Sequence, residues 1–247
     1  MLERVSAFVA DSAAATNEGE LKAILLQASQ GLGFAYFALT HHLDVRHGSK
    51  APLRLHNYPA DWEHYFDEHG LGGVDPVHRA SQRTGVGFAW SELPRLIALT
   101  PRDRTILAEA ARHGIGDGFT VPAHVPGRAN GSCSFAVRPG ETLPAEHLAA
   151  MQLIGCYAFE AARKIGSQHD TIPPAPRHVS RRQRDCLIWV ARGKSDADIA
   201  VILGLSPDTV HQYVKEARAA YDVVTRSQLV AHALFSGTIS FLDVLRR

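Results

Sequence analysis

The feature that most constrains the fold is a run of three short helical patterns, each with its own cap, between residues 180 and 221. The first, SRRQRDCLIWVARGK, has an apolar stripe at helical spacing and ends at Gly193. Ser195 caps the second, DADIAVIL, and Asp198 supplies the reciprocal half of a capping box. Gly204 then permits a tight turn. Three capped helices in succession predict a small helical bundle.

The third helix of this bundle has two distinct faces. Ser206 caps it, and Pro207 takes the first helical position, where its missing N–H costs nothing. The residues expected to face the other helices are Val210, Val214, Ala217 and Tyr221. The basic and amide-bearing front consists of His211, Gln212, Lys215 and Arg218. A charged face on one helix is usually only solvated surface. Because two capped helices and a glycine turn precede this helix, its basic face favours a helix-turn-helix that reads the major groove.

Charge and proline content divide the chain. From Arg177 onward there are 11 Lys and Arg against 7 Asp and Glu, whereas the preceding part holds 15 against 18. The segment SQHDTIPPAPRH cannot continue a helix or a central strand. We therefore predict a larger domain over residues 1–166, a linker over 167–178 and a small basic domain over 179–247, of which only the last meets a polyanion.

The larger domain mixes helical and β-prone patterns. Asn17 caps a first helix that ends at Gly31. The β-prone runs cover residues 34–42, 52–57, 118–124 and 132–139, and further helical patterns cover 60–69, 102–113 and 146–164. These elements predict an α+β chain, with an amino-terminal α/β/α sandwich around a mostly antiparallel sheet and a carboxy-terminal all-α helix-turn-helix bundle.

Several function classes lack the residues they require. No run approaches the roughly 18 apolar residues of a membrane helix, and MLERVSAFVADS is not a secretory signal. Three isolated cysteines fit a reducing cytoplasm. THHLDVRH holds His41, His42, Asp44 and His47, but the adjacent histidines would point to opposite faces of a strand and make a poor metal site. No activated nucleophile with an ordered base is visible. We expect a cytoplasmic chain with no membrane segment, cofactor, metal or enzymatic activity.

The stretch NYPADWEHYFDEHGLGGVDP combines four aromatic residues with five acids and contains no lysine or arginine; the last acid, Asp75, directly precedes a proline. The aromatic residues are Tyr58, Trp62, Tyr65 and Phe66. Each alone is more often ordinary core, and an aspartate before proline is more often a turn or cap residue. Taken as an ordered set, with a DNA-binding domain downstream, they favour a functional role over core packing alone.

The basic domain resembles the helix-turn-helix domain of LuxR-type transcription factors over VSRRQRDCLIWVARGKSDADIAVILGLSPDTVHQYVKEARAAYDVVTRSQLVAHALFSGTI. The resemblance implies base-edge contacts from His211 and Lys215, with Gln212 and Arg218 supplying further base or phosphate contacts. It also implies that the helix containing residues 227–235 pairs with its mate in a dimer. Gln183 departs from the family's usual glutamate, and an ionic tie is lost there.

The larger domain resembles the acyl-homoserine-lactone-binding domain of LuxR-type quorum-sensing receptors. The likeness rests on YPADW (58–62), DP (75–76), Trp90 and GDGFTVPAH (116–124), which occur in this order. We interpret Gly118, within the last of these, as a backbone requirement rather than a ligand contact.

The resemblance implies a role for each of six residues. Asp75 would accept the ligand's amide N–H, Trp62 would donate to the lactone carbonyl, and Tyr58 would donate to the acyl carbonyl. Ser134 would be a second, weaker donor near the acyl carbonyl, and Trp90 and Phe66 would line the pocket. Phe66 replaces the family's usual tyrosine, so a hydroxyl is missing from the pocket.

The combined resemblance implies a ligand-responsive transcriptional regulator that binds an N-acyl or aryl homoserine lactone. As a homodimer it would bind a palindromic double-stranded DNA operator, with RNA polymerase as a further partner. Two alternatives remain open. One is a LuxR-like receptor without a cognate synthase that reads another small apolar signal, and the other is a lactone-processing enzyme with a DNA-binding tail.

Overall fold

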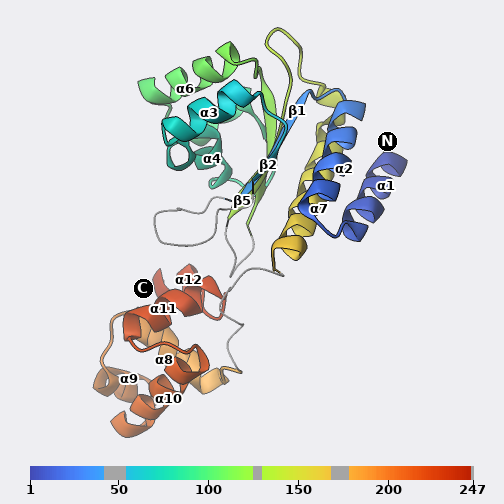
Figure 1. Ribbon diagram of the computed structural model, residues 1–247. Coiled ribbons are helices and arrows are strands. Elements are labelled where there is room, and N and C mark those ends of the chain that lie inside the picture. The colour runs from blue at the N-terminus through green and yellow to red at the C-terminus, as the bar shows by residue number, and fades with distance from the viewer. Residues whose placement is uncertain (42–53, 125–129, 168–177, 246–247) are drawn as a thin grey trace. The chain divides into compact units, whose positions relative to one another are not determined.

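The computed structural model describes residues 1–41, 54–124, 130–167 and 178–245, and the chain falls into two compact units (Figure 1). One unit holds the described residues up to 167, and the other holds those from 178 onward. The predicted linker, apart from its ends, lies outside the described residues, so its boundaries stay a prediction.

The first unit is built on a five-stranded antiparallel sheet in the order β2-β1-β5-β4-β3. The strands are β1 (Tyr36–His41), β2 (Arg54–His56), β3 (Phe88–Ala89), β4 (Gly118–Ala123) and β5 (Gly131–Ala136). β1 and β5 are paired along their whole length, with Tyr36 opposite Ala136 and His41 opposite Gly131. This confirms the predicted antiparallel sheet. The four predicted strands are all present, with shorter bounds.

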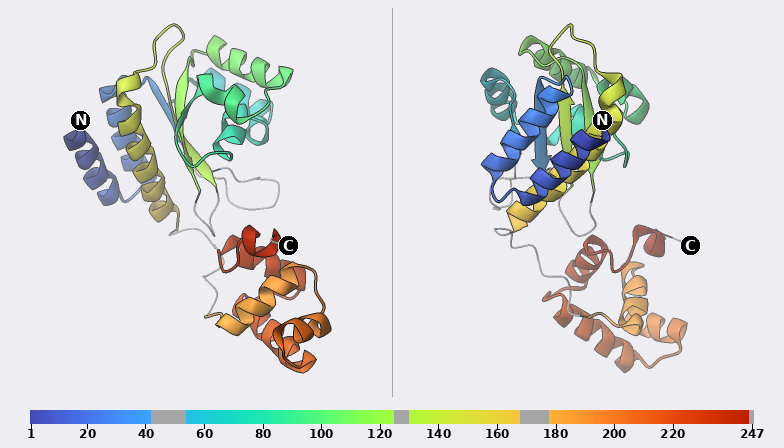
Figure 2. Two further views of the ribbon diagram at one scale, coloured as in Figure 1. Left: turned by 180° about the vertical axis from the view of Figure 1, so that it is seen from behind. Right: turned by 90° about the vertical axis from the view of Figure 1, so that its right-hand side faces the viewer.

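One face of the sheet carries the large apolar side chains and forms the main core. These side chains include Phe37, Leu39, Phe119, Val121, Cys133 and Phe135, all buried. They pack against α1 (Leu2–Ala14), α2 (Glu18–Gly31) and α7 (Leu148–Ser167) (Figure 2). Asn17 accepts a hydrogen bond from the Glu20 N–H, as the capping pattern predicts. Helix α1 was not predicted from the sequence.

The opposite face of the sheet carries small and hydroxylated side chains. In antiparallel pairs the residues directly opposite each other share a face, so the register places Ala38, Ala136, Ser132, Ser134, Gly118 and Thr120 together on it. Above this face lie α3 (Ala60–Glu68), α4 (Pro76–Ser81), α5 (Leu93–Leu96) and α6 (Pro101–Arg112), with short 3-10 turns at Leu71–Gly73 and Trp90–Glu92. A third 3-10 turn, Ala145–His147, leads into α7 on the other side of the sheet. Side chains this small cannot fill the space beneath a helical layer, so the layer above must supply bulk.

The second unit is the predicted all-α bundle. Its helices are α8 (Arg181–Ala191), α9 (Asp196–Leu203), α10 (Pro207–Ala220), α11 (Arg226–Phe235) and α12 (Phe241–Leu245). The predicted Ser195–Asp198 capping box is present, and Ser206 caps α10. Gly204 has φ 65°, in the left-handed region that glycine adopts without strain.

The buried face of α10 is also as predicted. Val210, Val214, Ala217 and Tyr221 all lie in the core of the second unit. Ala200 on α9 is buried in the same core. Among the residues that the structure describes, in either unit, no helix combines the length and apolar character needed to cross a bilayer.

Candidate ligand site and DNA-reading helix

The candidate ligand site begins where β2 ends, at Asn57. Its side-chain oxygen accepts from the Phe37 N–H at 2.7 Å, and its side-chain nitrogen donates to the Ala35 carbonyl at 2.9 Å. Asn57 therefore ties this end of the edge strand to β1. Tyr58, the next residue, is held beside the sheet, and its ring packs edge-on against Tyr36, with ring centroids 6.0 Å apart.

An aromatic cluster covers the small-residue face of the sheet. It contains Tyr36, Tyr58, Trp62, Tyr65, Phe66 and Trp90, packed with Leu71, Ile106, Ala110, Ile115 and Ala136. Trp62 is only 5% exposed, and Phe66, one helical turn further on, meets it edge-to-face at 5.8 Å. The Tyr65 ring stacks on Trp62, with ring centroids 5.8 Å apart. Four of the six predicted ligand residues thus lie in one cluster.

Asp75 is buried and caps α4. Its Oδ1 accepts from the backbone N–H groups of Val77 at 2.6 Å and His78 at 3.1 Å, and Pro76 takes the first helical position. Asp75 is therefore a helix cap, as its position before a proline indicates, but capping uses only one of its two carboxylate oxygens. Burial raises the pKa of the Tyr58 hydroxyl, and the negative charge of Asp75 raises this pKa further.

Trp90 and Ser134 meet through Thr120, a residue that the sequence reading did not single out. Trp90 Nε1 donates to Thr120 Oγ1 at 2.8 Å, and Thr120 Oγ1 lies 2.9 Å from Ser134 Oγ. Thr120 is fully buried and lies opposite Ser134 in the sheet register. The sequence signal for Thr120 was its spacing from Gly118, because residues two apart on a strand lie on the same face.

Gly118 makes the close approach of Trp90 possible. A Cβ at this position would lie 2.6 Å from Trp90 Cε2 and 2.9 Å from the Phe135 carbonyl oxygen. This is the backbone requirement that the sequence analysis predicted for Gly118. It also fixes the plane of the indole against the sheet.

Three polar groups of the site have no hydrogen-bond partner among the described residues. They are the Tyr58 hydroxyl, Trp62 Nε1 and the second oxygen of Asp75, Oδ2. None of them is fully shut off from solvent. Two donors and one acceptor that have no protein partner and are open to solvent are available to a polar ligand.

β2 brings two further polar side chains to the site that the sequence analysis did not predict. The Arg54 guanidinium lies 5.4 Å from the centre of the Phe66 ring. The guanidinium is paired with the Asp67 carboxylate at 2.5 Å. His56 lies beside Tyr58, with ring centroids 6.1 Å apart. The aromatic stretch itself contains no arginine, but the preceding strand β2 brings Arg54 to the site.

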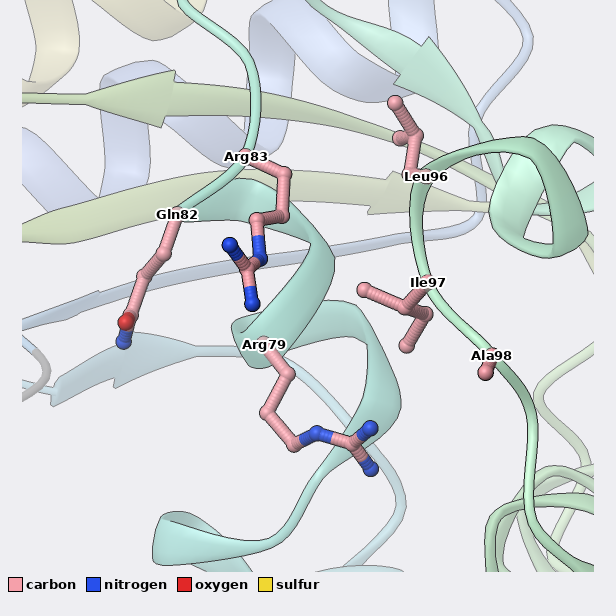
Figure 3. A pocket seen from close by; sticks show the side chains of 6 residues that line it. All are labelled: Arg79, Gln82, Arg83, Leu96, Ile97 and Ala98. Atoms are coloured by element: carbon pink, nitrogen blue, oxygen red, sulfur yellow. The ribbon is translucent and has the colours of Figure 1, made fainter.

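A cavity of about 660 Å³ lies elsewhere in the first unit, near the end of α4 (Figure 3). Its lining is Arg79, Gln82, Arg83, Leu96, Ile97 and Ala98, and it includes none of the predicted ligand residues. Arg79 Nη1 is paired with Asp103 at 2.7 Å. Two arginines do not suit an uncharged ligand, so we place the candidate site at the aromatic cluster, where matched donors and acceptors meet.

The second unit presents the predicted DNA-reading face on α10. His211, Gln212 and Lys215 are exposed. His211 Nδ1 lies 3.3 Å from the Asp196 carboxylate, which Arg226 also holds. Although burial alone would raise the pKa of Asp196, these two partners lower it.

Arg218, in contrast, is half-buried. Its Nη1 donates to the Val224 carbonyl at 2.8 Å, which ties the end of α10 to the following turn. If Arg218 also contacts DNA, as predicted, its guanidinium must bind DNA while it keeps the hydrogen bond to the Val224 carbonyl.

Gln183 links the start of α8 to the front of α10. Its Oε1 accepts from the Ser180 N–H, and its Nε2 donates to Glu216 Oε2, each at 2.8 Å. Glu216 also accepts from Gln212 Nε2 at 2.8 Å. In place of the family's ionic interaction at position 183, the neutral Gln183 amide donates a hydrogen bond to the Glu216 carboxylate. A glutamate at position 183 would instead repel Glu216.

Two family matches cover most of the chain. Residues 17–162 match the "Autoinducer binding domain", and residues 178–233 match "Bacterial regulatory proteins, luxR family". The chain belongs to the LuxR family. It combines an autoinducer-binding domain with a helix-turn-helix domain, as quorum-sensing transcriptional regulators of this family do. The LuxR family consists of regulators rather than enzymes, which confirms the prediction that the chain is not an enzyme.

The relatives of this LuxR-family chain carry names that agree. The quorum sensing-dependent transcriptional regulator RpaR of Rhodopseudomonas palustris is 30% identical over 198 residues, covering 80% of this chain and 79% of RpaR. The transcriptional activator LuxR of Aliivibrio fischeri is 27% identical over 189 residues, covering 75% of this chain and 74% of LuxR. A crystal structure of Escherichia coli SdiA has the same fold, with a TM-score of 0.65 at 24% identity and 99% of each chain covered.

Proposed function

We propose that the first unit binds an N-acyl or aryl homoserine lactone in the aromatic cluster and that the chain regulates transcription in response. The single observation that carries the proposal is the set of three unpartnered groups, the Tyr58 hydroxyl, Trp62 Nε1 and Asp75 Oδ2, beside a sheet face of small side chains. A homoserine lactone offers one amide N–H donor and two carbonyl acceptors. Two donors and one acceptor in the protein are the complementary set.

Each predicted role then has a physical basis. Asp75 accepts the amide N–H on Oδ2 while Oδ1 continues to cap α4, and the bond is charge-assisted. Trp62 donates to the lactone carbonyl and Tyr58 to the acyl carbonyl. Ser134 is the second donor if Thr120 donates to its oxygen, because the Ser134 proton is then directed to the ligand. Trp90 and Phe66 supply the apolar walls.

The DNA-binding half of the proposal rests on α10. His211, Gln212 and Lys215 lie on its exposed front, from which side chains of a recognition helix reach base edges. We propose that two copies bind a palindromic double-stranded operator in the cytoplasm, with α11 pairing between the copies and Arg218 near the phosphates. RNA polymerase is the partner through which such a regulator acts.

A second candidate ligand class is favoured by a structure of SdiA in complex with octanoyl-rac-glycerol, whose chain matches this one with a TM-score of 0.63. An acylglycerol has hydroxyl donors and an ester carbonyl but no amide N–H. The missing hydroxyl at Phe66 is a departure from the family's usual pocket. A receptor that reads such a molecule, without a cognate lactone synthase, is therefore the second candidate.

A thermal-shift titration of the full chain with acyl and aryl homoserine lactones and with octanoylglycerol separates the two. Lactone binding raises the melting temperature by mass action, by an amount that grows with concentration above Kd. A shift with octanoylglycerol and with none of the lactones would reject the lactone proposal. Electrophoretic mobility shifts on palindromic DNA, with and without the ligand that binds, then test the regulatory response.

A further inference from the structure

The sheet beneath the aromatic cluster carries a row of side chains that runs across four strands. His56 on β2 lies opposite Ala38 on β1. Ala38 lies opposite Ser134 on β5, and Ser134 lies opposite Thr120 on β4. Residues opposite each other in antiparallel strands project from the same face. His56 therefore belongs to the floor of the candidate site, with only the small Ala38 between it and Ser134.

The hydrogen bond of His56 fixes which of its ring nitrogens carries the proton. Nε2 lies 3.1 Å from Glu63 Oε1 on α3, and a carboxylate can only accept, so Nε2 is the donor. The side chain is 12% exposed, and burial, acting against the charge of Glu63, lowers the pKa of the His56 ring. A lowered pKa favours the neutral ring, in which Nδ1 is an acceptor. Nδ1 is buried and has no hydrogen-bond partner in the described chain.

The protein groups nearby leave this acceptor unmatched. The nearest aromatic neighbour, Tyr58, makes no hydrogen bond with it. Arg54, two residues earlier on the same strand, has its guanidinium held by Asp67 at 2.5 Å, with Glu63 at 3.9 Å. None of these neighbouring side chains donates to His56 Nδ1, which leaves a buried acceptor available to a donor from a ligand.

The ligand head cannot supply that donor. A homoserine lactone has one donor, its amide N–H, which the proposed function assigns to Asp75. A second donor can lie only in the tail. We propose that His56 Nδ1 accepts a hydrogen bond from a hydroxyl on the ligand's tail, so the signal is a homoserine lactone with a hydroxylated acyl or aryl tail. This inference rests on the proposed function, because it takes the position of the head from it.

The first test needs no variant. Dissociation constants at pH 7.5 are measured by calorimetry on the full chain for 3-hydroxyacyl, unsubstituted and 3-oxoacyl lactones of one chain length. An aryl pair with and without a ring hydroxyl completes the set. We expect at least one hydroxylated member to bind about 5- to 50-fold more tightly than its unsubstituted partner, the range for satisfying a buried acceptor. Equal binding within every set overturns this inference alone, whereas no binding by any lactone overturns the proposed function as well.

A variant pair then assigns the preference to His56. His56→Leu removes the acceptor at similar volume and is expected to abolish the preference, so that the hydroxylated lactone and its unsubstituted partner have equal dissociation constants. His64→Leu is the matched control, because His64 lies on α3 with its side chain 81% exposed. Melting temperatures without ligand show whether each variant is folded. A hydroxyl preference that survives in folded His56→Leu would show that another residue meets the tail.

Discussion

The two oxygens of Asp75 allow its structural and ligand-binding roles to be separated by substitution. Oδ1 accepts from the N–H groups of Val77 and His78, whereas Oδ2 has no partner among the described residues. Asp75→Ala removes both roles. Loss of an N-cap costs about 0.5–2 kcal/mol, which lowers the melting temperature by about 2–4 °C per kcal/mol in a domain of this size. A lost ligand response in that variant would therefore be ambiguous.

Asp75→Asn resolves the ambiguity. Asparagine caps helices as well as aspartate does, and its one oxygen is needed by the two backbone N–H groups. The side-chain NH₂ must then take the place of Oδ2, where it would meet the ligand's amide N–H donor to donor. We expect a melting temperature close to that of the unsubstituted protein but loss of a charge-assisted bond worth about 1.5–3 kcal/mol. That loss corresponds to a Kd about 10- to 150-fold weaker.

The assay is thermal denaturation without ligand, followed by a titration with the tightest-binding lactone. Asp61→Asn is the control, because Asp61 is an exposed acid in the first turn of α3. If Asp75→Asn bound the lactone with an unchanged Kd, Oδ2 would not be the amide acceptor and the assignment of the ligand head would fail. If it bound weakly but also melted as early as Asp75→Ala, the cap argument would be wrong.

Three further substitutions test other parts of the structure. Gly118→Ala puts a Cβ 2.6 Å from Trp90 Cε2, so urea unfolding should show a loss of about 1–3 kcal/mol, and unchanged stability would contradict the close packing. Gln183→Glu sets a second carboxylate against Glu216, so the melting temperature and operator affinity should both fall and recover when Glu216→Gln is added; failure to recover would show that the pair is not the cause. Lys215→Ala should weaken operator binding and reduce the slope of log affinity against log salt by about 1. A changed lactone Kd in that variant would argue against separate roles for the two units.

The sequence predicted best what depends on neighbours along the chain. The Ser195–Asp198 box, the Ser206 cap and the buried stripe of α10 all follow from side chains three or four residues apart, and all are present. Of the ligand residues, Tyr58, Trp62 and Phe66 lie within one turn and its approach, so local spacing sufficed to group them. Helix α1 begins without a side-chain cap, so the capping signal that marks helices such as α2 and α10 is missing from its sequence.

What the sequence could not show is which strands are neighbours. Thr120 and Ser134 share a hydrogen bond because β4 pairs with β5 in one register, and a shift by one residue would turn both to the other face. His56 and Arg54 reach the site for the same reason, since β2 is an edge strand beside β1. Alternation predicts that residues share a face of one strand, but the partner strand decides what they meet.

Because Asp75 serves helix α4 and the proposed ligand with one carboxylate, binding and local folding must be linked. A ligand that bonds only to the folded site opposes its opening by RT ln(1 + [L]/Kd), about 2.7 kcal/mol at 100 Kd. Hydrogen exchange of the Val77 and His78 amides, which Oδ1 caps, should then slow by up to about 100-fold with lactone present. The Asp198 amide, capped by Ser195 in the second unit, serves as the internal reference and should exchange at an unchanged rate. Protection that appeared elsewhere in the first unit but spared Val77 and His78 would show that the ligand binds without Asp75.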